Sequence, residues 1–133
     1  MMKHGILTIH SDDDFETMEK DILESLEINL LGVIKTVQAF IPLIRKGKEK
    51  KVLAISTGMA DIDLINAVEV DFAAPYAISK GALNVAIAKY NALYKKEGIL
   101  FLAVSPGYVA TERNQGMPIE DLEESLVCIL TFI

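Results

Sequence analysis

The sequence lacks the features that mark several large classes of protein. Its 133 residues include no tryptophan, only one cysteine and no excess of basic residues, and the net charge is −6. An acidic balance without a basic stripe argues against nucleic acid or an anionic membrane surface as a partner. Because the lone Cys128 has no second cysteine to pair with, an internal disulfide is excluded and a reducing, cytoplasmic compartment is expected.

Long apolar runs are also scarce. No stretch approaches the ~20 consecutive apolar residues of a membrane span, and the opening segment MMKHGILTIHSDDD has too short an apolar run for a signal peptide. We therefore expect no membrane partner. With 51% hydrophobic and 24% charged residues, the composition predicts one globular domain over residues 1–133.

A helical period runs through residues 16–46. Pro42 is expected to kink or end this helix, and Gly47 is expected to close the segment. Apolar residues recur there at steps of three and four, which is the spacing of one helix face. They are Ile22, Leu26, Leu30, Val33, Val37, Ile41 and Ile44.

Two continuous apolar runs, at 51–57 and 99–104, predict strands that are buried on both faces. Between them, residues 58–74 are expected to be irregular and residues 75–97 helical, and an amphipathic helix is expected near the C-terminus at 119–133. Strand, helix and strand in this order form a βαβ unit, so the fold class is α/β with parallel strands. Ligands of such sheets bind beyond the carboxyl ends of the strands.

The stretch PYAISKGALNV contains a tyrosine and a lysine one helical turn apart, Tyr76 and Lys80. Residues four apart share a helix face and can touch. A phenol is a poor proton donor or base near neutrality, and a neighbouring ammonium favours its ionised form. The pair can therefore form an acid/base device, although a bare YxxxK also fits a packed tyrosine beside a solvated lysine.

Four sequence motifs around this pair favour the acid/base interpretation over the packed tyrosine. EINLLGV around Asn29, VLAIST at 52–57, YAISKGALN at 76–84 and VSPGYVATE at 104–112 follow one another in a fixed order. Together they resemble the short-chain dehydrogenase/reductase family, over almost the whole chain from about Gly5 to Thr111, and most closely its fungal members. The resemblance implies a Rossmann-like, doubly wound parallel sheet.

The resemblance also implies roles for individual residues. Tyr76 would be the general acid in carbonyl reduction and the base in alcohol oxidation. Lys80 would support the ionised phenol and hydrogen-bond the nicotinamide ribose, and Asn29 would hold a water in the proton relay. The family's substrate-orienting hydroxyl falls on Thr57, which is favoured, with Ser56 as the competitor.

An NAD or NADP cofactor follows from the same resemblance. Pro106, Gly107, Val109 and Thr111 would line the nicotinamide and its neighbouring phosphates. The family's glycine-rich turn is absent, however, because no GxxxGxG occurs, and no residue corresponds to the one that selects NAD or NADP. The chain thus looks like the C-terminal half of a family domain, without roughly the first hundred residues. One sheet edge and both apolar faces should then be poorly covered.

Three functions remain open at this point. The first is an NAD(P)-dependent oxidoreductase acting on a small-molecule carbonyl or alcohol, although this chain is not expected to bind a dinucleotide tightly. The second is an inactive fragment that serves as an oligomerising module, since the family forms homo-oligomers through its long helices. The third, a Ser–Lys hydrolase using Ser56 and Lys80, needs an oxyanion hole that the sequence does not reveal. No spacing of residues predicts a metal site.

Overall fold

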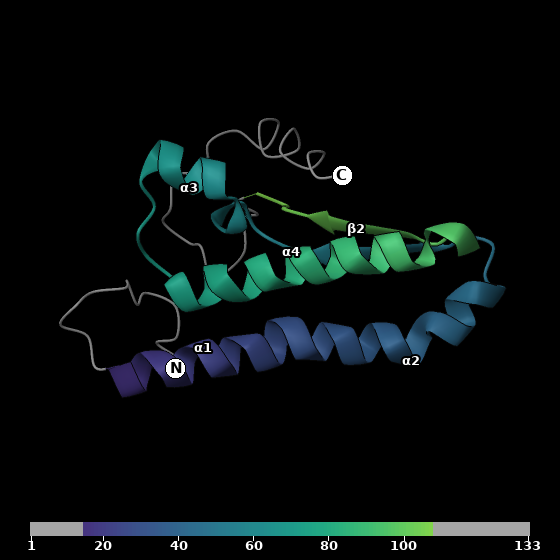
Figure 1. The fold of residues 1–133 in the computed structure, drawn as a ribbon, viewed down its shortest axis with the longest axis horizontal. Coiled ribbons are helices and arrows are strands. Elements are labelled where there is room, and N and C mark those ends of the chain that lie inside the picture. Colours follow the sequence, from purple (N-terminus) through teal and green to yellow (C-terminus); the bar gives the residue numbers. More distant parts are fainter. Residues whose placement is uncertain (1–14, 108–133) are drawn as a thin grey trace.

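The structure, a computed structural model, describes residues 15–107 of the chain. Figure 1 shows two long helical segments lying side by side, with a short sheet next to one of them. In chain order the elements are α1 (Phe15–Leu26), the π-helical turn η1 (Glu27–Leu31), α2 (Gly32–Lys46), β1 (Lys51–Ile55), the 3-10 turn η2 (Gly58–Ala60), α3 (Ile62–Val68), α4 (Ala74–Tyr94), the 3-10 turn η3 (Lys95–Glu97) and β2 (Leu100–Val104).

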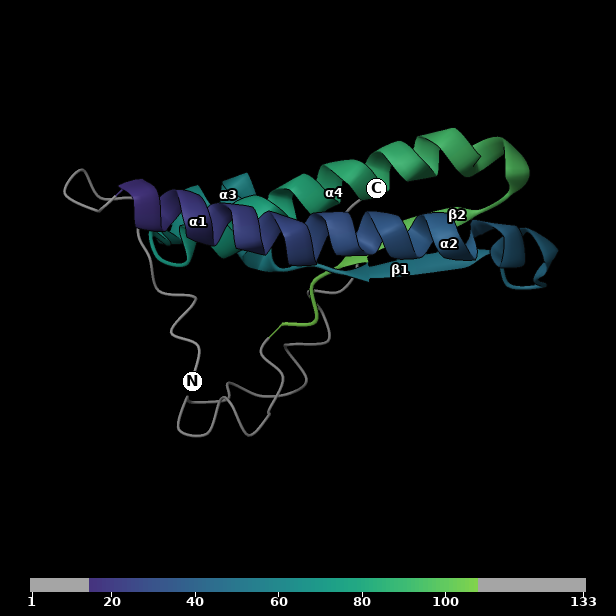
Figure 2. The same cartoon turned by 90° about the horizontal axis from the view of Figure 1, so that it is seen from below.

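The helix predicted over 16–46 is confirmed as three consecutive pieces, α1, η1 and α2, which form one nearly continuous rod (Figures 1 and 2). Pro42 lies inside α2 and does not end it, so of the two expected outcomes, a kink or an end, the end is excluded. The helix ends at Lys46, where the Gly47 N–H reaches the carbonyls of Leu43 and Ile44. The π-helical turn in the middle was not predicted, because the apolar residues keep steps of three and four across it, as they would in an α-helix.

The predicted parallel βαβ unit is confirmed. α4 connects β1 to β2, and the two strands pair in parallel with Val52 opposite Phe101 and Ala54 opposite Ala103. α4 carries Pro75 in its first turn, as expected of a residue that needs no helical N–H partner. The helical segment closes at Gly98, whose φ of +69° places it in the left-handed region that favours glycine.

The core lies between one face of the sheet and the long helices. Val52 and Ala54 of β1 alternate toward this face, and Phe101 of β2, only 1% exposed, lies beside them. The helices contribute Val37 and Ile41 from α2, and Leu83 and Ile87 from α4. The helical period at 16–46 therefore identified the inward side of the rod, on which Val37 and Ile41 are buried and the other predicted residues are half-buried.

The opposite face of the sheet is uncovered in the part of the chain that the structure describes. Leu53 is 59% exposed and Ile55 is 54% exposed, so the prediction of a strand buried on both faces is wrong for β1. The physical reason is that α2 and α4 pack on the same side of the sheet, and a strand with helices on one side alternates in burial. Poor coverage was expected on both faces and is found on one.

The segment between β1 and α4 is more ordered than expected. Residues 58–74 were predicted to be irregular, yet they contain η2 and the helix α3. The short elements begin at side-chain caps: the Thr57 hydroxyl accepts from the Met59 N–H, and the Asp61 carboxylate accepts from the Leu64 N–H. The helix predicted at 119–133 lies outside the described residues.

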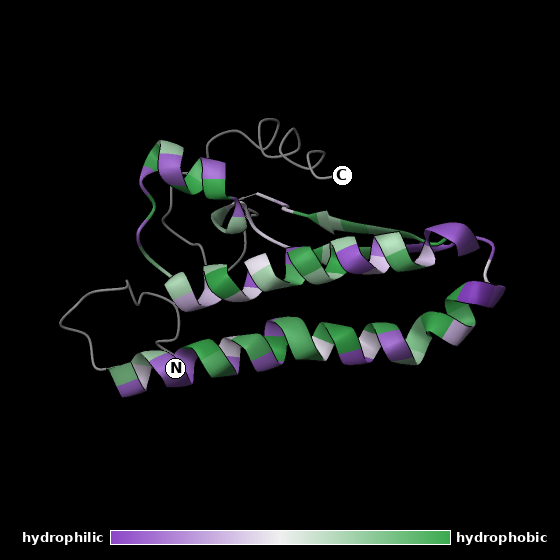
Figure 3. Cartoon of the chain, viewed as in Figure 1, coloured by the Kyte–Doolittle hydropathy of each residue, from purple (hydrophilic) through white to green (hydrophobic). Residues whose placement is uncertain are grey.

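By length and composition alone, the rod from Phe15 to Lys46 could cross a membrane, which corrects the expectation that no segment is long enough. Figure 3 shows that polar and apolar residues alternate along it, as on an amphipathic helix. Val37 and Ile41 of its apolar stripe belong to the core shared with α4 and the sheet. Only 11% of the apolar stretch is buried and no residue of α1 is, so the rod packs on the core along one stripe and is exposed over most of its surface.

Candidate active site

The carboxyl ends of the two strands are held side by side. The Ser56 N–H donates to the Val104 carbonyl at 2.7 Å, which extends the parallel pairing one residue beyond β1. The Gly58 N–H donates to the Ser105 hydroxyl at 3.0 Å, which joins the two segments that follow the strands. Gly107 comes directly after this junction with a φ of +69°, a conformation that a residue with a Cβ rarely adopts.

Lys80 reaches this end of the sheet from α4. Its ammonium donates to the Ile55 carbonyl, the last carbonyl of β1, at 2.8 Å. The same Nζ lies 5.8 Å from the centre of the Tyr76 ring, so the two residues are neighbours as their spacing predicted. Burial lowers the pKa of Lys80 because it disfavours the charged ammonium.

The two candidate hydroxyls have different surroundings. Ser56 is 6% exposed, and its Oγ donates to the Asn84 side-chain carbonyl at 2.6 Å. Thr57 is half-buried, and its Oγ1 accepts from the Met59 N–H at 3.3 Å. A hydroxyl that accepts this way keeps its proton available for another acceptor.

Asn29 lies in the π-helical turn and faces α4. Its Nδ2 donates to the Ser79 hydroxyl at 3.0 Å, and Ser79 in turn donates to the Tyr76 carbonyl at 2.7 Å. α4 packs against both α1 and η1, so this contact belongs to a larger helix–helix interface. The structure thereby brings Asn29 next to the helical turn that carries Tyr76 and Lys80.

Three polar residues of this region were missed from the sequence: Ser79, Asn84 and Ser105. Tyr76, Lys80 and Asn84 follow one another at steps of four, so a polar stripe along a mostly apolar helix was visible. That spacing could have drawn attention to Asn84. Nothing in the sequence says that Ser105 would bond to a backbone N–H from the other strand end.

Two further regions bear on the search for a site. Val109 and Thr111 lie outside the described residues.

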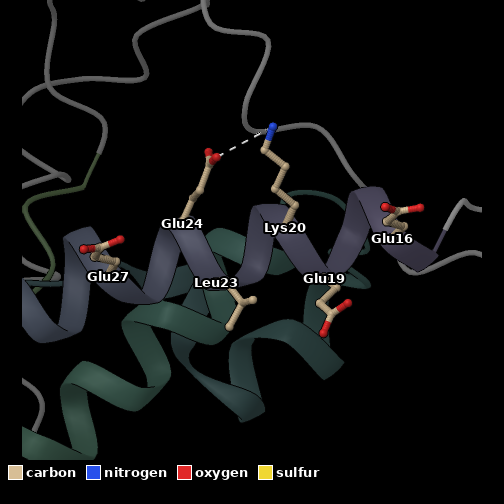
Figure 4. A pocket seen from close by; sticks show the side chains of 6 residues that line it. All are labelled: Glu16, Glu19, Lys20, Leu23, Glu24 and Glu27. Carbon is tan, nitrogen blue, oxygen red and sulfur yellow. Dashed lines mark ion pairs between the residues drawn. The ribbon is translucent and has the colours of Figure 1, made fainter.

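A hollow beside α1, shown in Figure 4, is lined by Leu23, by Lys20 and by the four glutamates Glu16, Glu19, Glu24 and Glu27, with Lys20 and Glu24 3.9 Å apart. No group of residues suited to a metal ion occurs within 15–107.

Comparison with known proteins identifies the family. The sequence model of the short chain dehydrogenase family matches residues 5–121. This chain belongs to the short-chain dehydrogenase family. It is 55% identical over 94 residues to the short-chain dehydrogenase/reductase AacuF of Aspergillus aculeatus and 47% identical over 94 residues to the short chain dehydrogenase virK of Hypocrea virens, which confirms the resemblance to fungal members.

The chain spans about a third of the length of these relatives, since the match covers 70% of this chain and 35% of AacuF. Among solved structures, an NADPH-bound carbonyl reductase from chicken fatty liver is similar with a TM-score of 0.70 and 25% identity. That match covers 92% of this chain and 51% of the reductase. The partial Rossmann-like α/β fold predicted from the sequence is therefore confirmed.

Proposed function

We propose that the Tyr76–Lys80 end of the fold is the catalytic end of an NAD(P)-dependent oxidoreductase that interconverts a carbonyl and an alcohol. The observation that carries the proposal is the Lys80 ammonium, which α4 holds at the carboxyl end of β1 beside the Tyr76 ring. Ligands of parallel α/β sheets bind at this end of the strands. The family match supplies the reaction class.

In this proposal each residue has one task. The cofactor, when bound, supplies or accepts the hydride at the carbonyl carbon. Tyr76 gives its phenolic proton to the carbonyl oxygen during reduction and takes it back during oxidation. The positive charge of Lys80 stabilises the phenolate that remains, and Asn29 holds the water through which the proton is replaced.

Thr57 is the better candidate for the hydroxyl that orients the substrate oxygen. Ser56 is buried and its proton is given to Asn84, so it is poorly placed to donate to a ligand. Thr57 is half-buried and only accepts from Met59, which leaves its own proton for a substrate. Ser56→Ala should then weaken folding more than turnover, and Thr57→Val the reverse.

The residues present fit one end of the cofactor better than the other. Gly107, with its left-handed backbone beside the strand ends, suits close approach of a nicotinamide, and we assign Pro106, Val109 and Thr111 to the same task. A glycine-rich turn for the pyrophosphate is missing from the sequence. We infer that NAD or NADP binds weakly to residues 1–133 alone.

The exposed apolar surface favours a second candidate, an inactive module that assembles with copies of itself. Within residues 15–107, Leu53 and Ile55 leave one sheet face uncovered. α4 also carries small residues, among them Gly81 and Ala88, that permit close contact between helices. A homo-oligomer formed through the long helices would cover exposed apolar residues on them, such as Phe40, Leu43 and Val85, whereas Leu53 and Ile55 lie on the opposite side of the sheet and would need a second contact.

Two preparations separate these functions. The chain as it stands should bind NADH and NADPH more weakly than micromolar in calorimetric titrations and should self-associate in light scattering. A chimera in which the N-terminal part of AacuF precedes residue 5 should bind one dinucleotide and reduce small carbonyl compounds. A chimera that binds the dinucleotide but reduces none of a broad carbonyl panel would contradict the enzymatic proposal and leave the assembly module.

A further inference from the structure

Ser79 is the most buried polar residue of the described chain, with no exposed surface, and it lies between two helices. Its hydroxyl contacts Asn29 of the π-helical turn on one side and the Tyr76 carbonyl of its own helix on the other. The distances are 3.0 Å and 2.7 Å, so both are hydrogen bonds of ordinary length. A single side chain therefore joins two of the residues assigned to the proton relay.

The Asn29 amide, the Ser79 hydroxyl and the Tyr76 carbonyl can be donor and acceptor in only one order. A backbone carbonyl can only accept, so the Ser79 proton goes to Tyr76. The Ser79 oxygen is then left to accept, and the amide nitrogen of Asn29 must be the donor. The orientation of the Asn29 side chain, with its amide nitrogen toward Ser79, is thus determined by Ser79.

The shape of the π-helical turn explains why the hydrogen bond between Asn29 and Ser79 is needed. Glu27–Leu31 is wider than an α-helical turn, and the Gly32 N–H donates to the Glu27 carbonyl five residues earlier. Turns of this kind are rare, so we expect contacts from outside the helix to hold this one in place. The bond from Asn29 to Ser79 is such a contact, because it joins the middle of the wide turn to a buried point on α4.

We propose that Ser79 is a positioning residue: it pins the π-helical turn to α4 and so sets where Asn29 lies relative to Tyr76 and Lys80. The contribution of Ser79 to catalysis rests on the proposed oxidoreductase function. A simpler role is that a small side chain at position 79 only lets the helices approach each other. Alanine would serve that role equally well, so Ser79→Ala separates the two.

The deciding experiment uses NMR on the 133-residue chain with Ser79→Ala and a matched control, Thr36→Val. Thr36 also donates its hydroxyl to a carbonyl of its own helix, that of Gly32 at 2.8 Å, but it is exposed and joins no second helix. Ser79→Ala should shift the side-chain amide signals of Asn29 and speed hydrogen exchange of the Gly32 N–H at least tenfold. Thr36→Val should leave the Asn29 signals in place.

Unchanged Asn29 signals and Gly32 exchange within twofold of the parent in Ser79→Ala would overturn the proposal. So would an equal response to Thr36→Val. A double-mutant cycle with Asn29→Ala adds a second measure: the two single changes should each lower the folding equilibrium constant about fivefold, and the double change by little more than either alone. Additive losses would show that the two side chains are not coupled.

Kinetics of the AacuF chimera test the catalytic meaning. Ser79→Ala should lower kcat about tenfold or more and leave KM for the carbonyl substrate within twofold, because a misplaced relay slows the chemistry without touching the substrate. An unchanged kcat beside altered NMR signals would reduce Ser79 to a structural residue and would leave the proposed function intact. If the parent chimera shows no turnover, the proposed function fails and the NMR measurements alone decide whether Ser79 positions Asn29.

Discussion

The two halves of α4 are built differently. Its first turns carry hydroxyl, amide and ammonium groups, and Ser79, Lys80 and Asn84 each bond to another element or to the end of β1. Its last turns pack aromatic rings: Tyr90 and Tyr94 lie 5.4 Å and 5.6 Å from Phe101 of β2, measured between ring centres. One helix thus combines a polar end that suits chemistry with an apolar end that holds helix and strand together.

Charged groups at the aromatic end strengthen this division. Arg45 at the end of α2 makes two bonds to the Glu97 carboxylate, at 2.6 Å and 2.9 Å, and lies over the Tyr94 ring. The hydrogen bonds from Arg45 lower the pKa of Glu97. Because both residues are exposed, this pair joins the ends of two elements without the cost of burying charge. The polar groups at this end bond to partners that hold helix and strand together, whereas the Lys80 ammonium at the other end lies beside the Tyr76 ring.

The largest expected effect is on turnover, and it comes from a substitution at the polar end of α4. In the AacuF chimera, Tyr76→Phe should lower kcat by roughly 10²–10⁴ because it removes the transferable proton and keeps the ring. The free energy of unfolding should change by less than about 1 kcal/mol. Tyr94→Phe is the matched control at the aromatic end, and it should leave kcat within twofold. Turnover of Tyr76→Phe within a few-fold of the parent would show that Tyr76 is not the acid.

The next largest effect is on stability, and it comes from a substitution at the aromatic end of α4. Phe101→Ala should lower the free energy of unfolding by about 3–5 kcal/mol, since it empties the space against Tyr90, Tyr94 and the α4 stripe. Leu53→Ala, on the uncovered face of β1, should change it by less than about 0.5 kcal/mol. Denaturant titration of the chain measures both. Equal losses for the two variants would mean that the Leu53 face is covered in solution, for instance by a second copy of the chain.

The sequence predicted the backbone of the fold better than the contacts of the polar end, and it gave no prediction for the aromatic cluster of Tyr90, Tyr94 and Phe101. The period at 16–46 and the apolar runs at 51–57 and 99–104 reflect burial, which repeats along a chain and can be read from it. The burial of β1 on both faces was predicted wrongly, because the apolar run is that of a strand with neighbours on both sides and the described chain supplies helices on only one.

The site was predictable in its residues but not in its contacts. Tyr76 and Lys80 were brought together by helical spacing, which depends on sequence distance alone. Asn29 and Ser79 are 50 positions apart, and Asn29 lies in the π-helical turn, which the helical period did not predict. Ser56 and Thr57 could not be separated from the sequence because both carry hydroxyls. What distinguishes them is the partner Asn84, which folding places beside Ser56.

The smallest expected effect is the pH dependence of stability that arises from Lys80. It differs in sign from the effect expected of Tyr90 at the other end of α4. Burial lowers the pKa of Lys80 in the folded chain below its usual 10.5, so the unfolded chain binds more protons between these two values. Stability should therefore rise with pH as the solution passes through the lowered pKa, with a slope below the limit of about 1.4 kcal/mol per pH unit for one proton.

Tyr90 at the aromatic end should respond in the opposite sense. Burial, with a smaller contribution from Tyr94, raises the pKa of Tyr90 above 10.0, so the folded chain holds its proton longer and stability falls as pH rises beyond about 10. Lys80→Met removes only the first effect. Denaturant titrations of parent and variant between pH 7 and 11 should show the rise in the parent, its absence in Lys80→Met, and the later fall in both. Parallel curves throughout would mean that the Lys80 ammonium is fully hydrated and is not held against the end of β1, which would remove the main support for an active site there.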